Sequence, residues 1–276
     1  MSYLPKKQSI GVFDSGFGGL DILKGIVKEL PEYNYVYLGD TARSPYGNRS
    51  PEIVYEFTRQ AIDFLFRHHC SLIILACNTA SSDALRKIQT EYLPHTYPGK
   101  QVLGVLIPGA EEATVYTRNQ RIGVIATEGT VASGAFIREL TKLNPATKVF
   151  QQACPLLVPL IETGEHNSTI IEPILEQYLR PLLNEKIDTL ILGCTHYGIL
   201  KHHIRKIAGS DLHIISEATV VPEKLRFYLK KHAEQEALLG KESTLQFYST
   251  DPTEKFTFLG SQFFGSTIHP LPATLQ

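Results

Sequence analysis

One short pattern occurs twice in the sequence, and each copy ends an apolar run in a cysteine. The first copy covers residues 72–82 and contains Cys77, and the second covers residues 190–197 and contains Cys194. In both copies an apolar run of strand length precedes the cysteine, small polar residues follow it, and a helical pattern comes next. We therefore predict two strand–loop–helix units with a thiol after each strand. In open parallel sheets ligands bind at the carboxyl-terminal ends of the strands. The next helix begins there, and its amino-terminal end stabilises a thiolate.

A second pair of segments has a similar spacing. Residues 10–16 and 122–129 both run from a strand pattern into a glycine-containing loop, 112 residues apart, and the two cysteines are 117 residues apart. This agreement favours an internal repeat of one α/β unit. The alternative is that any two α/β units share the order strand, glycine, helix.

Apolar and alternating runs predict the remaining strands. They are expected at residues 10–13, 35–39, 72–75, 101–106, 121–126, 148–153, 190–193, 212–215, 245–248 and 256–259. We expect an α/β fold with two similar three-layer domains, mainly parallel sheets, a pseudo-twofold relation and the active site in the cleft between them. The first domain is expected to be discontinuous, with residues 1–98 plus 214–276, and the second to cover residues 99–213.

Composition excludes several classes of function. The chain has 276 residues, of which 43% are hydrophobic, and this is enough for one large or two ordinary domains. The net charge is −1 without a basic cluster, so we expect neither a nucleic-acid partner nor a polybasic membrane surface. The first residues contain no apolar signal region, and no apolar run is long enough for a membrane span. We therefore expect a cytoplasmic protein without a membrane partner.

The sequence gives no support for a metal or nucleotide site. The four cysteines lack C-x-x-C spacing, and they are Cys70, Cys77, Cys154 and Cys194. The adjacent histidine pairs at 68–69 and 202–203 point in different directions on a helix, so they cannot easily share an ion. The glycine-rich turn at residues 14–19 could cradle an anion, but it lacks the Lys-Ser/Thr ending of a P-loop. We expect four free thiols, no metal and no cofactor.

Two thiols facing each other across a cleft suit the inversion of a stereocentre. One group must remove a proton from one face while another delivers a proton to the opposite face. A cysteine titrates near about 8.5, so its surroundings can hold either protonation state. The nearest candidate helper for Cys77 is Asp14, and Glu162 and His196 are the candidates beside Cys194.

Each of these residues also has a purely structural interpretation. Free cysteines are among the most buried residue types. We interpret Cys70 and Cys154 as buried structural residues of this kind. Asp14 could cap the following helix, and Glu162 could be a surface acid. The short polar residues at the expected helix starts could combine capping with ligand binding.

Four phrases of the chain, FDSGFGGL, GDTARSPYG, ACNTAS and GCTHYG, resemble those of the glutamate racemases, which are cofactor-independent members of the aspartate/glutamate racemase superfamily. Their order and spacing match along nearly the whole chain. The resemblance implies that Cys77 and Cys194 are the acid/base catalysts, with Asp14 assisting the first and Glu162 and His196 the second. It implies substrate contacts from Asp14, Ser15, Tyr46, Gly47, Asn78, Thr79, Thr130, Thr195 and His196.

The resemblance also implies glutamate as the substrate, a role in supplying D-glutamate for peptidoglycan, and a protein that needs no cofactor. We expect a homodimer. One alternative is a racemase for aspartate or another small amino acid. The aspartate racemases, however, typically have an acidic residue where His196 follows GCT. The other alternative is a catalytically silent paralogue that binds glutamate, but a pure binder would not need both thiols.

Overall fold

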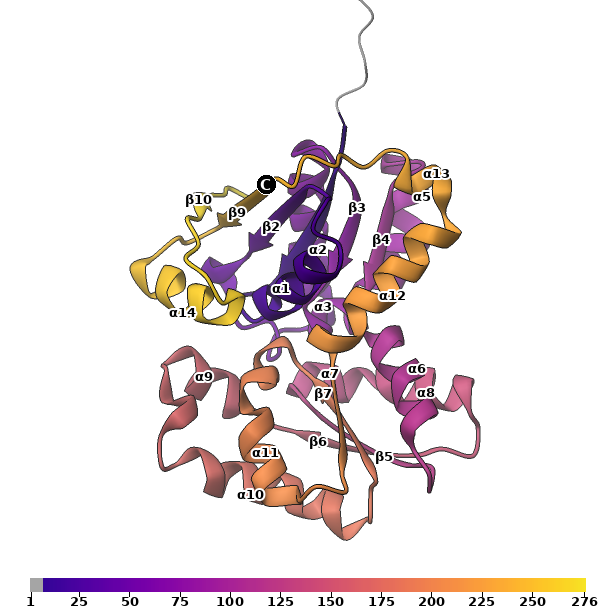
Figure 1. The fold of residues 1–276 in the computed structure, drawn as a ribbon, viewed down its shortest axis with the longest axis vertical. Coiled ribbons are helices and arrows are strands. Elements are labelled where there is room, and N and C mark those ends of the chain that lie inside the picture. The colour runs from indigo at the N-terminus through magenta and orange to yellow at the C-terminus, as the bar shows by residue number, and fades with distance from the viewer. Residues whose placement is uncertain (1–6) are drawn as a thin grey trace, which may run out of the picture.

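The computed structural model describes residues 7–276, which form two α/β units stacked along the long axis of the molecule (Figure 1). The first unit contains a sheet of strand order β10-β9-β2-β1-β3-β4, and the second contains a sheet of order β6-β5-β7-β8. Every strand pairing is parallel. The strands are β1 (Ser9–Asp14), β2 (Tyr35–Gly39), β3 (Cys70–Leu75), β4 (Gln101–Gly104), β5 (Arg121–Ala126), β6 (Lys148–Ala153), β7 (Thr189–Gly193), β8 (His213–Ser216), β9 (Leu245–Ser249) and β10 (Leu271–Pro272).

Helices cover the faces of both sheets (Figure 1). The α-helices are α1 (Gly19–Glu29), α2 (Pro51–Arg67), α3 (Asn78–Asp83), α4 (Leu85–Lys87), α5 (Leu93–Thr96), α6 (Leu106–Tyr116), α7 (Glu128–Ser133), α8 (Ala135–Leu143), α9 (Leu157–Glu162), α10 (Ile171–Asn184), α11 (Lys201–Ala208), α12 (Glu217–Lys231), α13 (Ala233–Glu236) and α14 (Glu254–Phe264). Residues Thr41–Arg43, Glu165–Asn167 and Thr195–Leu200 form 3₁₀ helices, and Ile88–Tyr92 forms a π-helical segment. Across residues 7–276, no helix combines the length and the apolar character that a membrane span needs.

The central strands are buried on both faces, which explains their continuous apolar sequences. Every residue of β2, β3 and β7 is buried, as expected for parallel strands covered by helices on both sides. The strand orders β2-β1-β3-β4 and β6-β5-β7-β8 are equivalent, so β3 corresponds to β7. The predicted α/β fold with two similar, mainly parallel units is confirmed. The correspondence places Cys77 and Cys194 just after equivalent strands.

Sheet membership places the two crossings between the units later in the chain than the predicted bounds of 1–98 plus 214–276 and 99–213. Residues 101–104 form β4 and pair with β3, so they belong to the first sheet. Residues 213–216 form β8 and pair with β7, so they belong to the second sheet. We therefore propose that the first unit comprises residues 7–104 and 217–276 and the second comprises residues 105–216.

The strand predicted at residues 256–259 is wrong, because these residues lie inside α14. The hydroxyl of Thr253 accepts a hydrogen bond from the backbone N–H of Phe256 at 3.1 Å and caps the helix. The buried residues Phe256, Leu259, Gly260 and Phe263 follow helical spacing. Within four residues, the sequence Phe-Thr-Phe-Leu shows an alternation that the longer stretch does not continue.

Helices α1 and α12 pack closely, although about 190 residues separate them in the chain. A Cβ atom at Gly25 in α1 would meet the backbone oxygen of Ala218 and the ring of Pro222 in α12. Only glycine permits this approach of the two helices. Helix α12 directly follows β8 of the second sheet. Its contact with α1 therefore holds the segment in which the chain returns from the second unit against the first unit.

Candidate active site

Both repeated thiols lie at one small cavity between the two units. Residues from both units line it, namely Ser15, Pro45, Tyr46, Gly47, Cys77, Asn78, Thr79, Thr127, Val158, Cys194, Thr195 and His196. Its volume is about 20 Å³, and a water molecule needs roughly 10–15 Å³. A ligand with several carbon atoms therefore requires this cavity to enlarge as it enters.

Cys77 follows β3 and is buried beside the loop after β1. Its Sγ donates a weak hydrogen bond to the hydroxyl of Ser15 at 3.5 Å. Burial, followed by the negative charge of Asp14, raises the pKa of the Cys77 thiol to about 12. This raised pKa favours the protonated thiol at neutral pH.

Cys194 follows β7 and has an imidazole and a carboxylate aligned behind it. The Nδ1 atom of His196 lies 3.8 Å from the Cys194 sulfur, and its Nε2 atom lies 3.2 Å from Oε1 of Glu162. The second contact has the distance of an ion pair but not the angle of a hydrogen bond. Nδ1 can take or return the proton of Cys194, which is the arrangement of a Cys–His pair.

The charges of this group support one another. Burial disfavours the imidazolium, but the neighbouring Cys194 and Glu162 outweigh burial and raise the pKa of His196 well above its usual value. Burial also acts to raise the pKa of Glu162, but His196 and the hydroxyl of Ser44, at 3.3 Å, overcome it and lower that pKa. The protonated form of His196 and the carboxylate form of Glu162 therefore stabilise each other.

Asp14 lies behind the cavity and links the two units. Its Oδ2 accepts the N–H of Gly16 at 3.0 Å, and its Oδ1 accepts the hydroxyl of Thr195 at 3.2 Å. Burial raises the pKa of this carboxyl, against the opposing charge of His196 and the hydrogen bonds that it accepts. Asp14 can thus influence both Cys77 and the loop that carries Cys194.

Three threonines form a second link between the units. The Thr79 hydroxyl lies 3.0 Å from that of Thr127 and 3.3 Å from that of Thr130, and the last two are 3.1 Å apart. The N–H of Gly129 also donates to the backbone oxygen of Gly47 at 2.8 Å. A Cβ at Gly47 would lie 2.5 Å from Cβ of Thr127, so a side chain there would push the units apart.

The structure brings all of the predicted site residues to this region, but not all of them to the cavity wall. The residues at the wall are Ser15, Tyr46, Gly47, Cys77, Asn78, Thr79, Cys194, Thr195 and His196. Asp14, Glu162 and Thr130 lie behind them. The Tyr46 hydroxyl donates its proton to Asp40, so it is not available as a donor to a ligand.

Sequence reasoning missed several contributors, including Thr127. In the repeat, Thr127 stands 112 residues after Ser15 and occupies the equivalent position after β5. Aligning the two halves beyond the cysteines would therefore have found it. The other missed residues are Ser44, Pro45, Val158 and Glu217, which the repeated pattern does not mark.

Glu217 is a buried acid at the start of α12 whose Oε2 accepts a hydrogen bond from Nδ2 of Asn78 at 2.7 Å. Burial raises its pKa well above the usual value, and the charge of Asp14 adds to this effect. A carboxyl with a raised pKa binds more protons in the folded chain than in the unfolded one. Its effect on stability is therefore most favourable at low pH and worsens as the pH rises above the usual glutamate range.

Replacing Glu217 with Gln removes this titration. The free energy of unfolding of Glu217→Gln, relative to the unsubstituted protein, should increase as the pH rises from about 4 to about 8, by up to about 1.4 kcal/mol per pH unit. Urea denaturation at a series of pH values measures the difference. Glu223→Gln, on an exposed position of the same helix, should give a nearly constant difference. A constant difference for Glu217→Gln as well would contradict the prediction.

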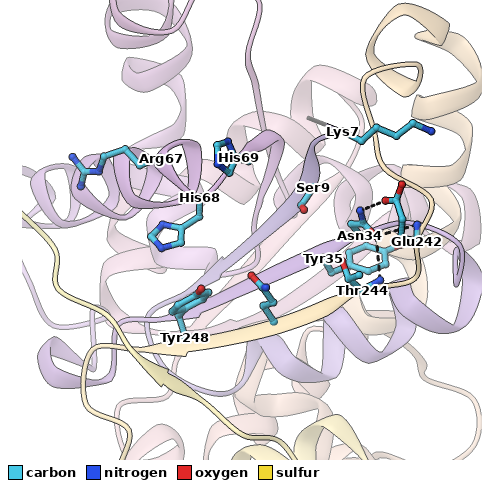
Figure 2. Close-up of a pocket in the computed structure, with 11 residues that line it drawn as sticks. Lys7, Ser9, Asn34, Tyr35, Arg67, His68, His69, Glu242, Thr244 and Tyr248 are labelled. Atoms are coloured by element: carbon cyan, nitrogen blue, oxygen red, sulfur yellow. Dashed lines mark hydrogen bonds between the residues drawn. The ribbon is translucent and has the colours of Figure 1, made fainter. Parts of the chain in front are cut away.

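A larger cavity lies elsewhere and does not share this chemistry. It has a volume of about 570 Å³ and lies at the amino-terminal ends of β1, β2 and β9, the opposite edge of the sheet from Cys77. Figure 2 shows that its cationic residues Lys7 and Arg67 point away from each other. No thiol lines the larger cavity, and its charged groups do not converge on one point. The small cavity that contains Cys77 and Cys194 is therefore the better candidate for catalysis, despite its size. Within residues 7–276, no group of three or more His, Cys, Asp or Glu side chains is arranged to hold a metal ion.

Comparison with known proteins shows that the chain is similar to amino-acid racemases over nearly its whole length. The model of the family described as Asp/Glu/Hydantoin racemase matches residues 10–221. A glutamate racemase from Syntrophus aciditrophicus is 38% identical over 96% of this chain and 95% of its own length. A glutamate racemase structure from Bacillus anthracis, 34% identical, superposes with a TM-score of 0.89 and covers 97% of this chain and 98% of that chain. Another from Francisella tularensis, in complex with D-glutamate, is 34% identical with a TM-score of 0.87, covering 97% of both chains. The chain therefore belongs to the Asp/Glu/hydantoin racemase family.

Proposed function

We propose that the protein is a glutamate racemase that interconverts L-glutamate and D-glutamate. The observation that carries the proposal is the pair of thiols, Cys77 and Cys194, placed after equivalent strands of two similar units and lining one cavity. The names of the relatives support glutamate as the substrate, and one related structure contains D-glutamate.

In the proposed reaction the two cysteines act on opposite faces of the substrate. One thiolate removes the α-proton and becomes a thiol, while the other thiol delivers a proton to the opposite face of the carbanion and becomes a thiolate. The configuration is inverted, and the two cysteines have exchanged protonation states. The reverse reaction uses the same two residues in the opposite order.

The groups beside each cysteine would manage these protons. His196, held by Glu162, can accept the proton of Cys194 and return it. Asp14 would assist Cys77 through its nearby charge, and the hydroxyl of Ser15 accepts the hydrogen bond of the Cys77 thiol. The proposed substrate contacts come from Asp14, Ser15, Tyr46, Gly47, Asn78, Thr79, Thr130, Thr195 and His196, and Thr127 is added to the set.

The proposal also covers the cofactor requirement, location, oligomeric state and biological role of the enzyme. We propose activity without cofactor or metal, a cytoplasmic location and a homodimeric state, with D-glutamate supplied for peptidoglycan. Purified protein mixed with L-glutamate in the presence of a chelator, with no cofactor added, should lose optical rotation until the mixture is racemic. Rotation that stays constant while glutamate binds would favour the silent paralogue. A requirement for an added metal or cofactor would contradict the cofactor-independent mechanism.

The kcat/KM for glutamate should exceed that for aspartate by about 100-fold. A site built to pair with a distal carboxylate leaves buried polar groups unpaired when the substrate is one methylene shorter. Circular dichroism with each pure enantiomer as the starting material measures both rates. Comparable values for the two amino acids would favour the alternative of an aspartate racemase.

A further inference from the structure

A buried hydrogen bond joins the candidate active site to the second crossing of the chain. Asn78 is the first residue of α3 and lines the cavity, and Glu217 is the first residue of α12, just after β8. The Nδ2 of Asn78 donates to Oε2 of Glu217 at 2.7 Å, and the two residues are only 3% and 2% exposed. Glu217 does not line the cavity itself.

The two side chains leave one polar atom each without a partner. Among residues 7–276, neither Oδ1 of Asn78 nor Oε1 of Glu217 has a hydrogen-bond partner, although both atoms are buried. Buried polar atoms in proteins are nearly always paired, so an unpaired atom in a residue that lines a cavity is available to a molecule that enters the cavity. Because Nδ2 is held by Glu217, the atom that Asn78 has left for a ligand is Oδ1. This carbonyl oxygen can only accept a hydrogen bond.

We propose that Glu217 is a positioning residue that fixes the amide of Asn78 so that its Oδ1 accepts a hydrogen bond from the α-ammonium group of the amino-acid substrate. This inference rests on the proposed function, since it assumes that an amino acid enters the cavity. Without Glu217 the amide is free to rotate and to present Nδ2, a donor, to the ammonium. Affinity for the amino group is then lost, whereas groups that bind the carboxylates are untouched.

The test compares two ligands and three proteins. Calorimetry measures the Kd of L-glutamate and of glutarate, which has both carboxylates but no amino group, for the unsubstituted protein, Glu217→Met and Glu217→Gln. In Glu217→Met the Kd of glutamate should rise about tenfold, the effect of one lost hydrogen bond to a charged group. The Kd of glutarate should change less than about twofold, within the effect of an untouched contact. In Glu217→Gln both values should stay within about threefold, because the Gln carbonyl can still accept from Nδ2.

Matched variants separate positioning from general damage. Asn78→Ala should weaken glutamate binding by itself, and Glu217→Met should have no further effect in that background, because Glu217 acts through Asn78. Glu223→Met, exposed on the same helix, is the control that should leave both Kd values unchanged. Glu217→Leu, which lacks the same acceptor but has another shape, repeats the measurement if the Met variant fails to fold.

Two results would overturn the inference. One is an unchanged glutamate Kd in Glu217→Met, and the other is a parallel loss for glutamate and glutarate, which would point to a collapsed site. Turnover is measured separately, so that the two proposals are distinguishable. A protein that binds glutamate with the expected pattern but never racemises it would refute the proposed function and support the role of Glu217.

Discussion

Replacing either Cys77 or Cys194 with Ala is expected to abolish the racemisation of glutamate. Each direction of the reaction requires one residue to remove a proton and another to deliver one, so neither thiol can substitute for its partner. The rate of change of circular dichroism, started from each enantiomer, measures the loss. The control variants are Cys70→Ala and Cys154→Ala, whose thiols are buried outside the cavity. They should keep their activity and lose only stability through a small cavity.

Solvent deuterium distinguishes two catalytic groups from one. In deuterated water the newly formed enantiomer should carry deuterium at low conversion, because the thiol that delivers the proton has exchanged with solvent. The remaining substrate should stay mostly protiated if the removing thiol returns its proton before exchange. A single base could carry the same proton to the other face, and the product would then be largely unlabelled. Unlabelled product, or full activity in either cysteine variant, would refute the two-thiol mechanism.

Replacing Gly18 with Ala is expected to lower kcat/KM for glutamate by about 100-fold, the effect of misplacing reacting groups by roughly an ångström. A Cβ at Gly18 would lie 2.5 Å from the hydroxyl of Thr195 and 2.9 Å from the backbone nitrogen of His196. It would push the loop that carries Cys194 away from the first unit. The backbone at Gly18 has φ −58°, which alanine adopts freely, so strain in the backbone is not the cause.

A second glycine provides the matched control for this substitution. Gly109 lies inside α6, and a Cβ there would meet only Ile191, at 3.8 Å. Gly109→Ala should therefore keep full activity and gain up to about 1 kcal/mol of stability from better helix propensity. Steady-state kinetics and thermal unfolding of both variants check the pair of expectations. Normal activity in Gly18→Ala, or an equal loss in Gly109→Ala, would contradict the steric argument.

Features determined by local sequence could be predicted from the chain alone. The buried strands are continuous apolar runs because helices cover both of their faces, and each thiol ends such a run. The crossing between the units could not be placed, because the pattern of residues 101–104 says that they form a strand but not which strand they join. Pairing with β3 is a tertiary contact, and no local pattern reports it.

The site shows the same division between local and tertiary information. Thr127 could have been found from the repeat, because it corresponds to Ser15. Glu217 could not, because an acid in the first turn of a helix is ordinarily an exposed group that complements the helix dipole. Only the packing of α12 against the first unit buries its carboxyl beside Asn78.

The contact between α1 and α12 also determines when the apolar face of α1 can be covered during translation. The apolar face of α1 emerges from the ribosome early, whereas its partner α12 follows only after the whole second unit has been synthesised. The second unit is one continuous stretch and can complete its own sheet in the meantime. A nascent chain must therefore carry an uncovered hydrophobic surface on its first unit for most of its synthesis, which is the period in which such surfaces aggregate or require a chaperone.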